Sequence, residues 1–228
     1  MTESEPFDFD AVDWVTSDHH FGHARIIELA ARPFASVEEM NHELIDRWNR
    51  VVGPDDVVLH LGDLALGSVE PSLAMTATLN GRRYLVPGNH DRISAAFVNS
   101  QEYHARFAPL YEDAGWTILS EQLMGRRGGH QVIACHFPYR GDSTSQERYT
   151  RLRPVDEGLP LLHGHTHDRG ASGLNGRQFH VGVDGHDFAP VPMSEIDEWL
   201  RVVVSHGAKT EQRRLDQLDE PVWLVDDL

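Results

Sequence analysis

The sequence predicts an α/β fold, and three observations support this class. Short β-like segments at residues 12–17, 57–61 and 84–86 alternate with amphipathic helical segments, which gives a βαβαβ order with a parallel core. Several of these segments end directly in small or chelating residues, where layered α/β proteins place their ligands. Beyond about residue 115 the pattern changes to strands, predicted at residues 116–124, 131–135, 159–162 and 177–183.

The helices and turns of this fold carry their own signals. Ser36 and Glu39 form a capping box that opens a helix running to about Arg50. A second helix is predicted from residue 69 to 79, because Asn80-Gly81 is a typical helix stop. Residues 125–129 form a glycine-rich turn between two strands, and a last helix fits residues 194–203.

Length and composition indicate one domain spanning residues 1–228. The chain has 228 residues, of which 40% are hydrophobic and 25% charged, enough for a well-buried core. Its recognisable core is expected at about residues 12–203, between acidic tails at residues 1–11 and 210–228.

Location and cofactor chemistry are also constrained by composition. No apolar run reaches the length of a membrane span, and the acidic first thirteen residues do not resemble a signal peptide, so we expect a cytoplasmic protein. The single cysteine, Cys135, permits no internal disulfide, and a metal would have to be bound by histidine and carboxylate.

The net charge argues against one class of partner. At −16, with 20 basic and 36 acidic residues, the chain lacks the clustered cations needed to bind extended duplex nucleic acid. A short nucleotide remains a suitable ligand. The oligomeric state is left open by the sequence.

The fifteen histidines are partly clustered into an ordered series of chelating motifs. Carboxylate oxygen and imidazole nitrogen bind divalent cations, and one carboxylate can bridge two of them. A single motif of this kind is common in turns, but five in succession at strand ends predict a metal site. The series is Asp18-x-His20, Gly62-Asp63, Gly88-Asn89-His90-Asp91, His136 and Gly164-His165-x-His167.

These five motifs, in this order, resemble the calcineurin-like metallophosphoesterases. Asp18-His-His-Phe-Gly-His23, Arg32-Pro-Phe34 and Val181-Gly-Val-Asp184 narrow the resemblance to a short bacterial and phage subgroup. The resemblance implies a four-layer α/β/β/α sandwich, in which two mixed sheets face each other and the metals lie at the loop edge.

The resemblance also implies residue roles. One divalent metal would be held by Asp18, His20, Asp63 and His167, and a second by Asp63, Asn89, His136 and His165, with Asp63 bridging. His90 would act as general acid or as a stabiliser of the transition state, and Asp91 would fix its orientation. Manganese is the first expectation for both metals, while iron, zinc and nickel suit the same ligands.

The expected activity is hydrolysis of a small phosphoester by a hydroxide bridging the two metals. A phosphodiesterase acting on small nucleotides or cyclic nucleotides is favoured, because the chain has no obvious cap insertion and His90 is placed to help an alkoxide leave. A phosphomonoesterase or protein phosphatase is the nearest alternative, and a non-catalytic scaffold that binds a protein partner is another. Candidate substrate contacts are His23, Arg25 and Arg140, and Asp184 and His186 are candidates to flank the site.

Overall fold

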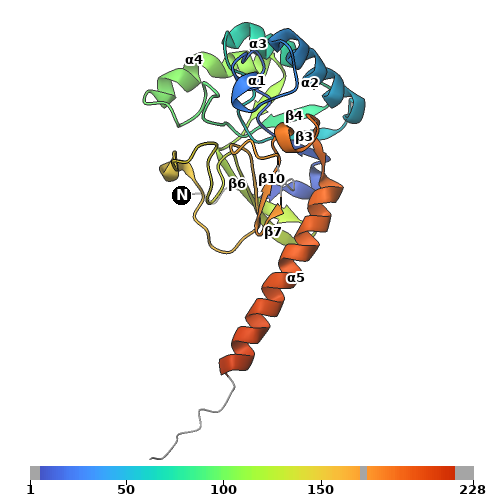
Figure 1. Ribbon diagram of the computed structural model, residues 1–228, viewed down its shortest axis with the longest axis vertical. Coiled ribbons are helices and arrows are strands. Elements are labelled where there is room, and N and C mark those ends of the chain that lie inside the picture. The colour runs from blue at the N-terminus through green and yellow to red at the C-terminus, as the bar shows by residue number, and fades with distance from the viewer. Residues whose placement is uncertain (1–5, 170–173, 219–228) are drawn as a thin grey trace, which may run out of the picture.

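The computed structural model describes residues 6–169 and 174–218, which form two mixed β-sheets with helices (Figure 1). In the five-stranded sheet, four strands run parallel and one edge strand, β11, is antiparallel. Its order is β11 (Val191–Pro192), β2 (Trp14–Thr16), β3 (Val57–His60), β4 (Arg82–Leu85) and β5 (Trp116–Ile118).

The six-stranded sheet also mixes parallel and antiparallel pairs. Its hairpin, β6 and β7, is antiparallel, whereas β7, β8 and β10 run parallel. Its order is β1 (Phe7–Asp8), β6 (Gln122–Arg127), β7 (His130–Cys135), β8 (Leu161–His163), β10 (Gln178–His180) and β9 (Leu174–Asn175).

Helices cover the outer face of the five-stranded sheet, and α5 runs along the side of the molecule and projects beyond it (Figure 1). Of the described helices, none is both long and apolar enough to cross a membrane. The α-helices are α1 (Ile26–Leu29), α2 (Val37–Val51), α3 (Val69–Thr76), α4 (Ser100–Asp113) and α5 (Met193–Leu218). Three short 3-10 helices complete the set: η1 (Phe9–Ala11), η2 (Thr150–Leu152) and η3 (Val183–Gly185).

The hydrophobic core has three parts, which confirms the predicted α/β class with two mixed sheets. Leu59 and Phe179 belong to the cluster between the sheets, and Trp48 of α2 packs in the cluster between the five-stranded sheet and its helices. On the outer face of the six-stranded sheet, a smaller cluster around Ile133 is covered by Tyr149 and Leu152 of the β7–β8 loop and η2.

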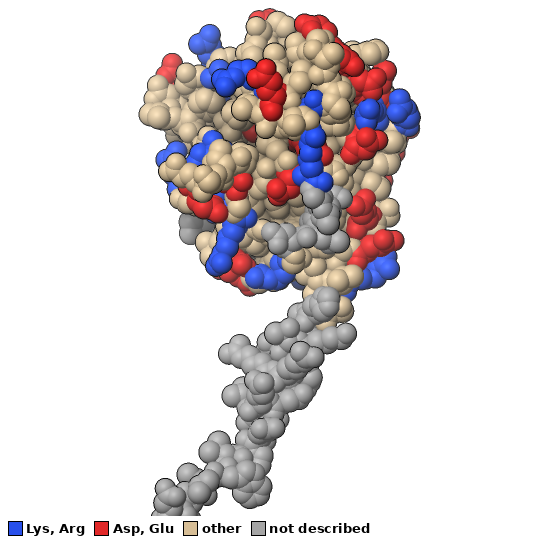
Figure 2. Space-filling model, in the orientation of Figure 1, with Lys and Arg blue, Asp and Glu red and all other residues tan. Residues whose placement is uncertain are grey.

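Charged side chains are spread over the surface. Figure 2 shows acidic and basic residues interspersed over the face in view, without an extended basic area among the described residues drawn there.

The structure differs from the sequence prediction at several elements. Helix α4 was not predicted, because Pro109 interrupts its pattern and only Ala108 and Tyr111 are fully buried. The single strand expected at residues 116–124 is two strands, β5 and β6, in different sheets. Strand β6 continues to Arg127, so the turn contracts to Gly128-Gly129, and α5 extends well past the predicted residue 203.

Part of the predicted N-terminal tail is docked on the body. Strand β1 pairs with β6, and Phe9 is fully buried between the sheets. Residues 1–5 and 219–228 of the predicted tails lie outside the described residues.

Backbone hydrogen bonds join the loops that follow strands of the two sheets. The amide of Val183 donates to the carbonyl of Ser17 (3.1 Å), which links the segment after β10 to the segment after β2. The amide of Asp18 donates to the carbonyl of Gly62 (3.0 Å), within the five-stranded sheet's own loops. The carboxyl ends of the central strands therefore meet at one edge of the sandwich, where the chelating motifs lie.

Candidate metal centre

Five of the seven predicted ligands lie close together, with Asp18 common to two groups of three. One ligand atom from each of Asp18, His20 and His167 lies within 4.8 Å of the others, and the same holds for Asp18, Asp63 and His136. All five side chains except that of His167 are essentially buried. Two adjacent groups of donors that share a carboxylate are the arrangement a two-metal site needs.

The other two predicted ligands adjoin this cluster. Asn89 Oδ1 lies 3.1 Å from Nε2 of His136. The main-chain amide of His165 donates to both carboxylate oxygens of Asp18, at 3.0 and 3.2 Å. The structure thus brings all seven predicted ligands into one contiguous cluster.

The ligand loops have an unusual backbone. Nine described residues other than glycine have positive φ, and five of these are predicted ligands. Such conformations cost about 1–3 kcal/mol each and concentrate at functional sites, and Asp and His are among the residues that tolerate them best. The five are Asp18 (61°), His20 (55°), Asp63 (55°), His165 (73°) and His167 (55°).

Two glycines allow the carboxylates to approach the backbone. A Cβ on Gly164 would collide with Asp18 Oδ2 and Ser17 Oγ, and a Cβ on Gly88 would collide with Asp63 Oδ1. These two motif glycines are therefore required for space beside the predicted ligands.

Hydrogen bonds fix which nitrogen of two histidine rings faces the cluster. Nδ1 of His136 donates to the carbonyl of Leu61 (2.8 Å), which leaves Nε2 toward the other ligands. Nδ1 of His167 donates to Oδ2 of Asp184 (2.8 Å). Asp184 in turn accepts two hydrogen bonds from the buried guanidinium of Arg32, at 2.9 and 2.8 Å. A carboxylate or carbonyl behind the histidine is the usual support of a metal ligand.

The electrostatics of the cluster fit a divalent cation. Burial raises the pKa of Asp18, whereas the histidines His136 and His90 outweigh burial and lower the pKa of Asp63. Burial, followed by the neighbouring His167, lowers the pKa of His20 far below its usual value, so this ring is a neutral donor. Nε2 of His20 is buried without a hydrogen-bond partner and lies 3.6 Å from Asp63 Oδ2. An orphaned imidazole nitrogen beside buried carboxylates suits a divalent metal ion, and the residues present fit one.

His90 lies at the exposed side of the cluster. Its Nε2 is 3.9 Å from Asp63 Oδ2, and its side chain is 40% exposed, so it can reach a bound molecule. Asp91, expected to orient this ring, instead accepts hydrogen bonds from the amides of Asp63 (2.8 Å), Leu64 (3.1 Å) and Gly88 (2.8 Å). Burial, with Asp63 nearby, raises the pKa of Asp91 to about 7. Its carboxylate also accepts a hydrogen bond from the hydroxyl of Tyr111 of α4 (3.3 Å). Among the described residues, none of its hydrogen bonds involves the His90 ring.

A cavity of about 600 Å³ opens beside the cluster. His23 and Arg25, two of the three candidate substrate contacts, line it together with His90, and one wall is apolar around Ile26 and Leu29. Among its described lining residues are three arginines and no carboxylate, although the protein as a whole is strongly acidic. Arg140 does not line this cavity, and its main-chain amide donates to Oε1 of Gln178 (3.0 Å).

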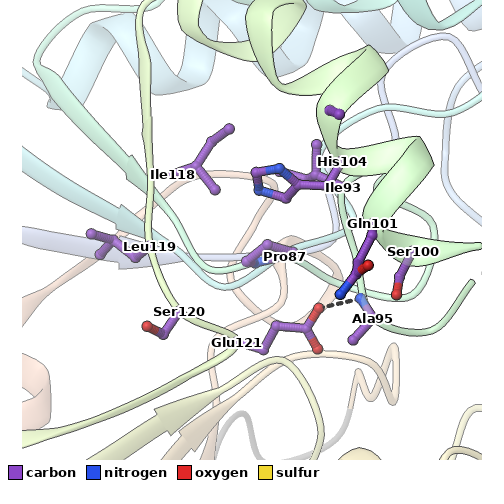
Figure 3. Close-up of a pocket in the computed structure, with 11 residues that line it drawn as sticks. Pro87, Ile93, Ala95, Ser100, Gln101, His104, Ile118, Leu119, Ser120 and Glu121 are labelled. Carbon is purple, nitrogen blue, oxygen red and sulfur yellow. Dashed lines mark hydrogen bonds between the residues drawn. The ribbon is translucent and has the colours of Figure 1, made fainter.

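A second cavity, of about 450 Å³, lies between α4 and the segment after β5 (Figure 3). Apolar side chains such as Ile93 and Ile118 form its walls, and Glu121 accepts a hydrogen bond from the amide of Ala95. None of the predicted ligands lines this cavity.

Sequence reasoning missed two residues that support the ligands. Arg32 was part of the motif Arg32-Pro-Phe34, which contributed to the family resemblance, but no role was predicted for it. Its partner Asp184 was predicted only as a candidate to flank the site. Asp142 carried no sequence signal except its place six residues after His136. Its Oδ2 lies 3.1 Å from Nε2 of His165.

The geometry places a candidate metal centre at the loop edge of a two-sheet sandwich, and the comparisons with known proteins give the family of the chain. The sequence model of the calcineurin-like phosphoesterases matches residues 14–224. The chain belongs to this family.

Relatives are found in mycobacterial phages. The Gene 66 protein of Mycobacterium phage D29 is 41% identical over 201 residues, which are 82% of this chain and 94% of that protein. The Gene 66 protein of Mycobacterium phage L5 is 37% identical over 179 residues, 75% of this chain and 86% of that protein. A protein of unknown function from Aquifex aeolicus, AQ665, shares the fold with a TM-score of 0.61 and 22% identity, covering 82% of this chain and 97% of that structure.

Proposed function

We propose that this protein is a two-metal phosphodiesterase that hydrolyses small nucleotide or cyclic-nucleotide diesters. The observation that carries the proposal is the cluster of seven predicted ligands beside a cavity whose described lining includes arginine and histidine but no carboxylate. Membership of the calcineurin-like phosphoesterases supports metal-dependent hydrolysis of a phosphoester.

The ligand sets are those that the family resemblance implies, and the two groups of possible metal-binding residues that share Asp18 support them. Asp18, His20, Asp63 and His167 would hold one divalent ion, and Asp63, Asn89, His136 and His165 the second. Bound there, two divalent ions would acidify a water molecule and offset the charge of the phosphate. We propose manganese for both positions, with iron, zinc and nickel as alternatives.

The remaining residues bind the substrate and move its protons. His90 is exposed toward the cavity, which lets its imidazole donate a proton to a leaving alkoxide. Arg25 lies on the cavity wall and would bind a phosphate oxygen, while the apolar wall around Leu29 suits the base or sugar of a nucleotide.

The diester preference rests on His90 and on the width of this open cavity, which accommodates groups on both sides of a phosphorus atom. A phosphomonoesterase or protein phosphatase would use the same ligands. A scaffold that only binds a protein partner is disfavoured by the complete set of predicted ligands, because five of the seven lie on strained backbone whose cost has no evident purpose without metal.

The test compares bis(p-nitrophenyl) phosphate, p-nitrophenyl phosphate and a panel of 2′,3′- and 3′,5′-cyclic nucleotides, each with manganese, iron, zinc or nickel. We expect a higher kcat/KM for the diesters, and turnover of at least one cyclic nucleotide. A higher kcat/KM for the monoester would assign a phosphomonoesterase. A metal-loaded protein without turnover of any ester, or a protein that binds no metal, would favour the scaffold.

A further inference from the structure

Asp142 is a buried acidic residue that the proposed chemistry does not use. It lies in the loop between β7 and β8, and its side chain is only 1% exposed although its neighbours Ser143 and Thr144 are exposed. A buried carboxylate is costly unless it is paired, so its partners indicate what it does.

Both oxygens of Asp142 are occupied by cationic or imidazole groups. Oδ1 accepts hydrogen bonds from Nε (3.0 Å) and Nη2 (2.6 Å) of Arg148. Oδ2 accepts from the main-chain amide of Arg148 (3.0 Å) and from Nη2 of Arg153 (3.3 Å). The same Oδ2 lies 3.1 Å from Nε2 of His165, a predicted ligand whose side chain is 2% exposed. The two atoms are not aligned as a hydrogen bond, and Nε2 of His165 has no other partner among the described residues.

A similar arrangement of arginine, carboxylate and histidine lies behind His167, a predicted ligand of the other metal position. There, buried Arg32 binds Asp184, and Asp184 accepts a hydrogen bond from Nδ1 of His167. In both cases an arginine holds a buried carboxylate and the carboxylate faces one ring nitrogen of a histidine. The two supports come from different parts of the chain, the β7–β8 loop and the α1 and η3 region.

We propose that Asp142 is a positioning residue for His165: it holds the ring with hydrogen on Nε2 and leaves Nδ1 as the donor for the second metal. Outer carboxylates of this kind fix the tautomer and orientation of the ring and raise its basicity. Arg148 and Arg153 keep the carboxylate in place. The inference rests on the proposed role of His165 as a ligand and not on any particular substrate.

Arg148 connects Asp142 with the cavity in which we propose that the substrate binds. It lines the cavity beside the metal cluster as well as binding Asp142. The β7–β8 loop thus contributes both a wall of the cavity and the support of a ligand.

The loop also offers a matched control. Glu147 pairs with the same Arg153 (2.7 Å) and accepts a hydrogen bond from the amide of Gly141 (2.9 Å), but it is half exposed and contacts no predicted ligand. Glu147→Gln therefore weakens the same loop without touching His165.

The experiment compares the full-length wild type with Asp142→Ala, Asp142→Asn, Glu147→Gln and His165→Asn. Manganese binding to the chelator-treated proteins is measured by isothermal titration calorimetry, and histidine tautomers in the metal-free proteins by two-bond ¹H–¹⁵N spectra. The His165 signal is assigned by its loss in His165→Asn. Thermal unfolding of each metal-free protein shows whether the variant is folded. If Asp142→Ala does not fold, the proposal is judged on Asp142→Asn, which preserves the side-chain volume.

We expect Asp142→Ala to lower the affinity for one of two manganese ions about 10- to 100-fold. The affinity should fall less in Asp142→Asn and stay unchanged in Glu147→Gln. The His165 ring should carry its hydrogen on Nε2 in wild type and Glu147→Gln, and be a mixture in Asp142→Ala. Wild-type affinities and tautomer in Asp142→Ala, or an equal loss in Glu147→Gln, would overturn the proposal. If His165→Asn retains both ions, the ligand role of His165 fails, while the tautomer result still reports on Asp142.

Discussion

The main-chain amide of His90 donates a hydrogen bond to Oδ1 of Asp63 (2.8 Å). This bond ties the proposed proton donor to the proposed bridging carboxylate, since a change in the position of one displaces the other. Asp91 reinforces the link by accepting the amides of Asp63 and Gly88. The proposed bridging carboxylate and the proposed proton donor therefore depend on the same pair of loops.

Asp63→Asn tests the bridging role. Asparagine tolerates the positive φ of this position, so the variant removes charge with little added backbone strain. We expect loss of stoichiometric metal binding and a fall of at least about 10³-fold in kcat/KM, because two cations lose a shared carboxylate. Elemental analysis and diester hydrolysis measure the two effects, with Asp46→Asn on the exposed side of α2 as control. Full activity in Asp63→Asn would refute the bridge.

His90→Gln tests proton donation. The loss should be about 10²- to 10⁴-fold for an alkyl or nucleotide diester, whose leaving group needs a proton, and much smaller for bis(p-nitrophenyl) phosphate. A series of diesters with leaving groups of different pKa gives the dependence directly. Equal losses across the series would argue for a binding role instead.

Arg25→Ala tests the cavity wall, with Arg140→Ala as its matched control. Arg25 lines the cavity and Arg140 does not. We expect KM for a nucleotide diester to rise about 10-fold in Arg25→Ala with little change in kcat, the loss of one charged hydrogen bond. Arg140→Ala should behave as wild type. Similar changes in both variants would place substrate recognition outside this cavity.

Gly164→Ala tests the close approach of the backbone to Asp18. The added Cβ would collide with the Asp18 carboxylate, so we expect metal affinity to fall about 10-fold or more and the free energy of unfolding to drop by about 1–3 kcal/mol. At Gly53 a Cβ would meet only ordinary contacts, the nearest 3.5 Å away, and Gly53→Ala serves as control. Metal titration and urea unfolding provide both measurements. An unchanged metal affinity in Gly164→Ala would show that the carboxylate can move freely.

The buried pair of His60 and His19 predicts how stability depends on pH. The amide of Gly62 donates to Nδ1 of His60 (3.1 Å), so Nε2 carries the hydrogen and donates to Nδ1 of His19 (2.9 Å). Burial, with a contribution from His136, lowers the pKa of His60 to about 3. Between that value and its ordinary pKa near 6.5, the unfolded chain binds a proton that the folded chain does not.

Stability from His60 is thus present above pH 6.5 and is lost as the pH falls toward 3. His60→Gln should reduce the slope of unfolding free energy against pH by about 1.4 kcal/mol per unit between pH 6 and 4. Urea unfolding of metal-free protein measures it, with the exposed His42→Gln as control. Identical slopes in wild type and His60→Gln would contradict the neutral buried pair.

The sequence predicted the elements whose signals are local. The capping box at Ser36 is realised, since its Oγ accepts the amide of Glu39 (3.2 Å) at the start of α2. His60 and His163, which lie in or next to apolar segments predicted as strands, are buried, as is Cys135, whose thiol pKa burial raises to about 12. Chelating residues directly after strands were recognisable for the same reason, because strand ends are marked by neighbouring residues.

Features that depend on distant partners were not predictable in this way. Arg32 and Asp184 are separated by 152 residues, and only the fold brings them together behind His167. Asp142 lies 3.1 Å from His165 and comes from a loop without regular periodicity. Helix α4 was not predicted because few of its residues are buried. The division of residues 116–127 into β5 and β6 depends on which sheet each strand joins.

The left-handed backbone of five ligand positions limits how the centre can be redesigned. Longer carboxylates or β-branched side chains would have to adopt a conformation that suits them poorly, whereas asparagine, aspartate, histidine and glycine adopt it more readily. Few residue types are therefore suitable at Asp18, His20 and Asp63 in a variant designed to change the metal preference. Broader choice exists at Asn89 and His136, where φ is ordinary and nearly any donor can be accommodated by the main chain.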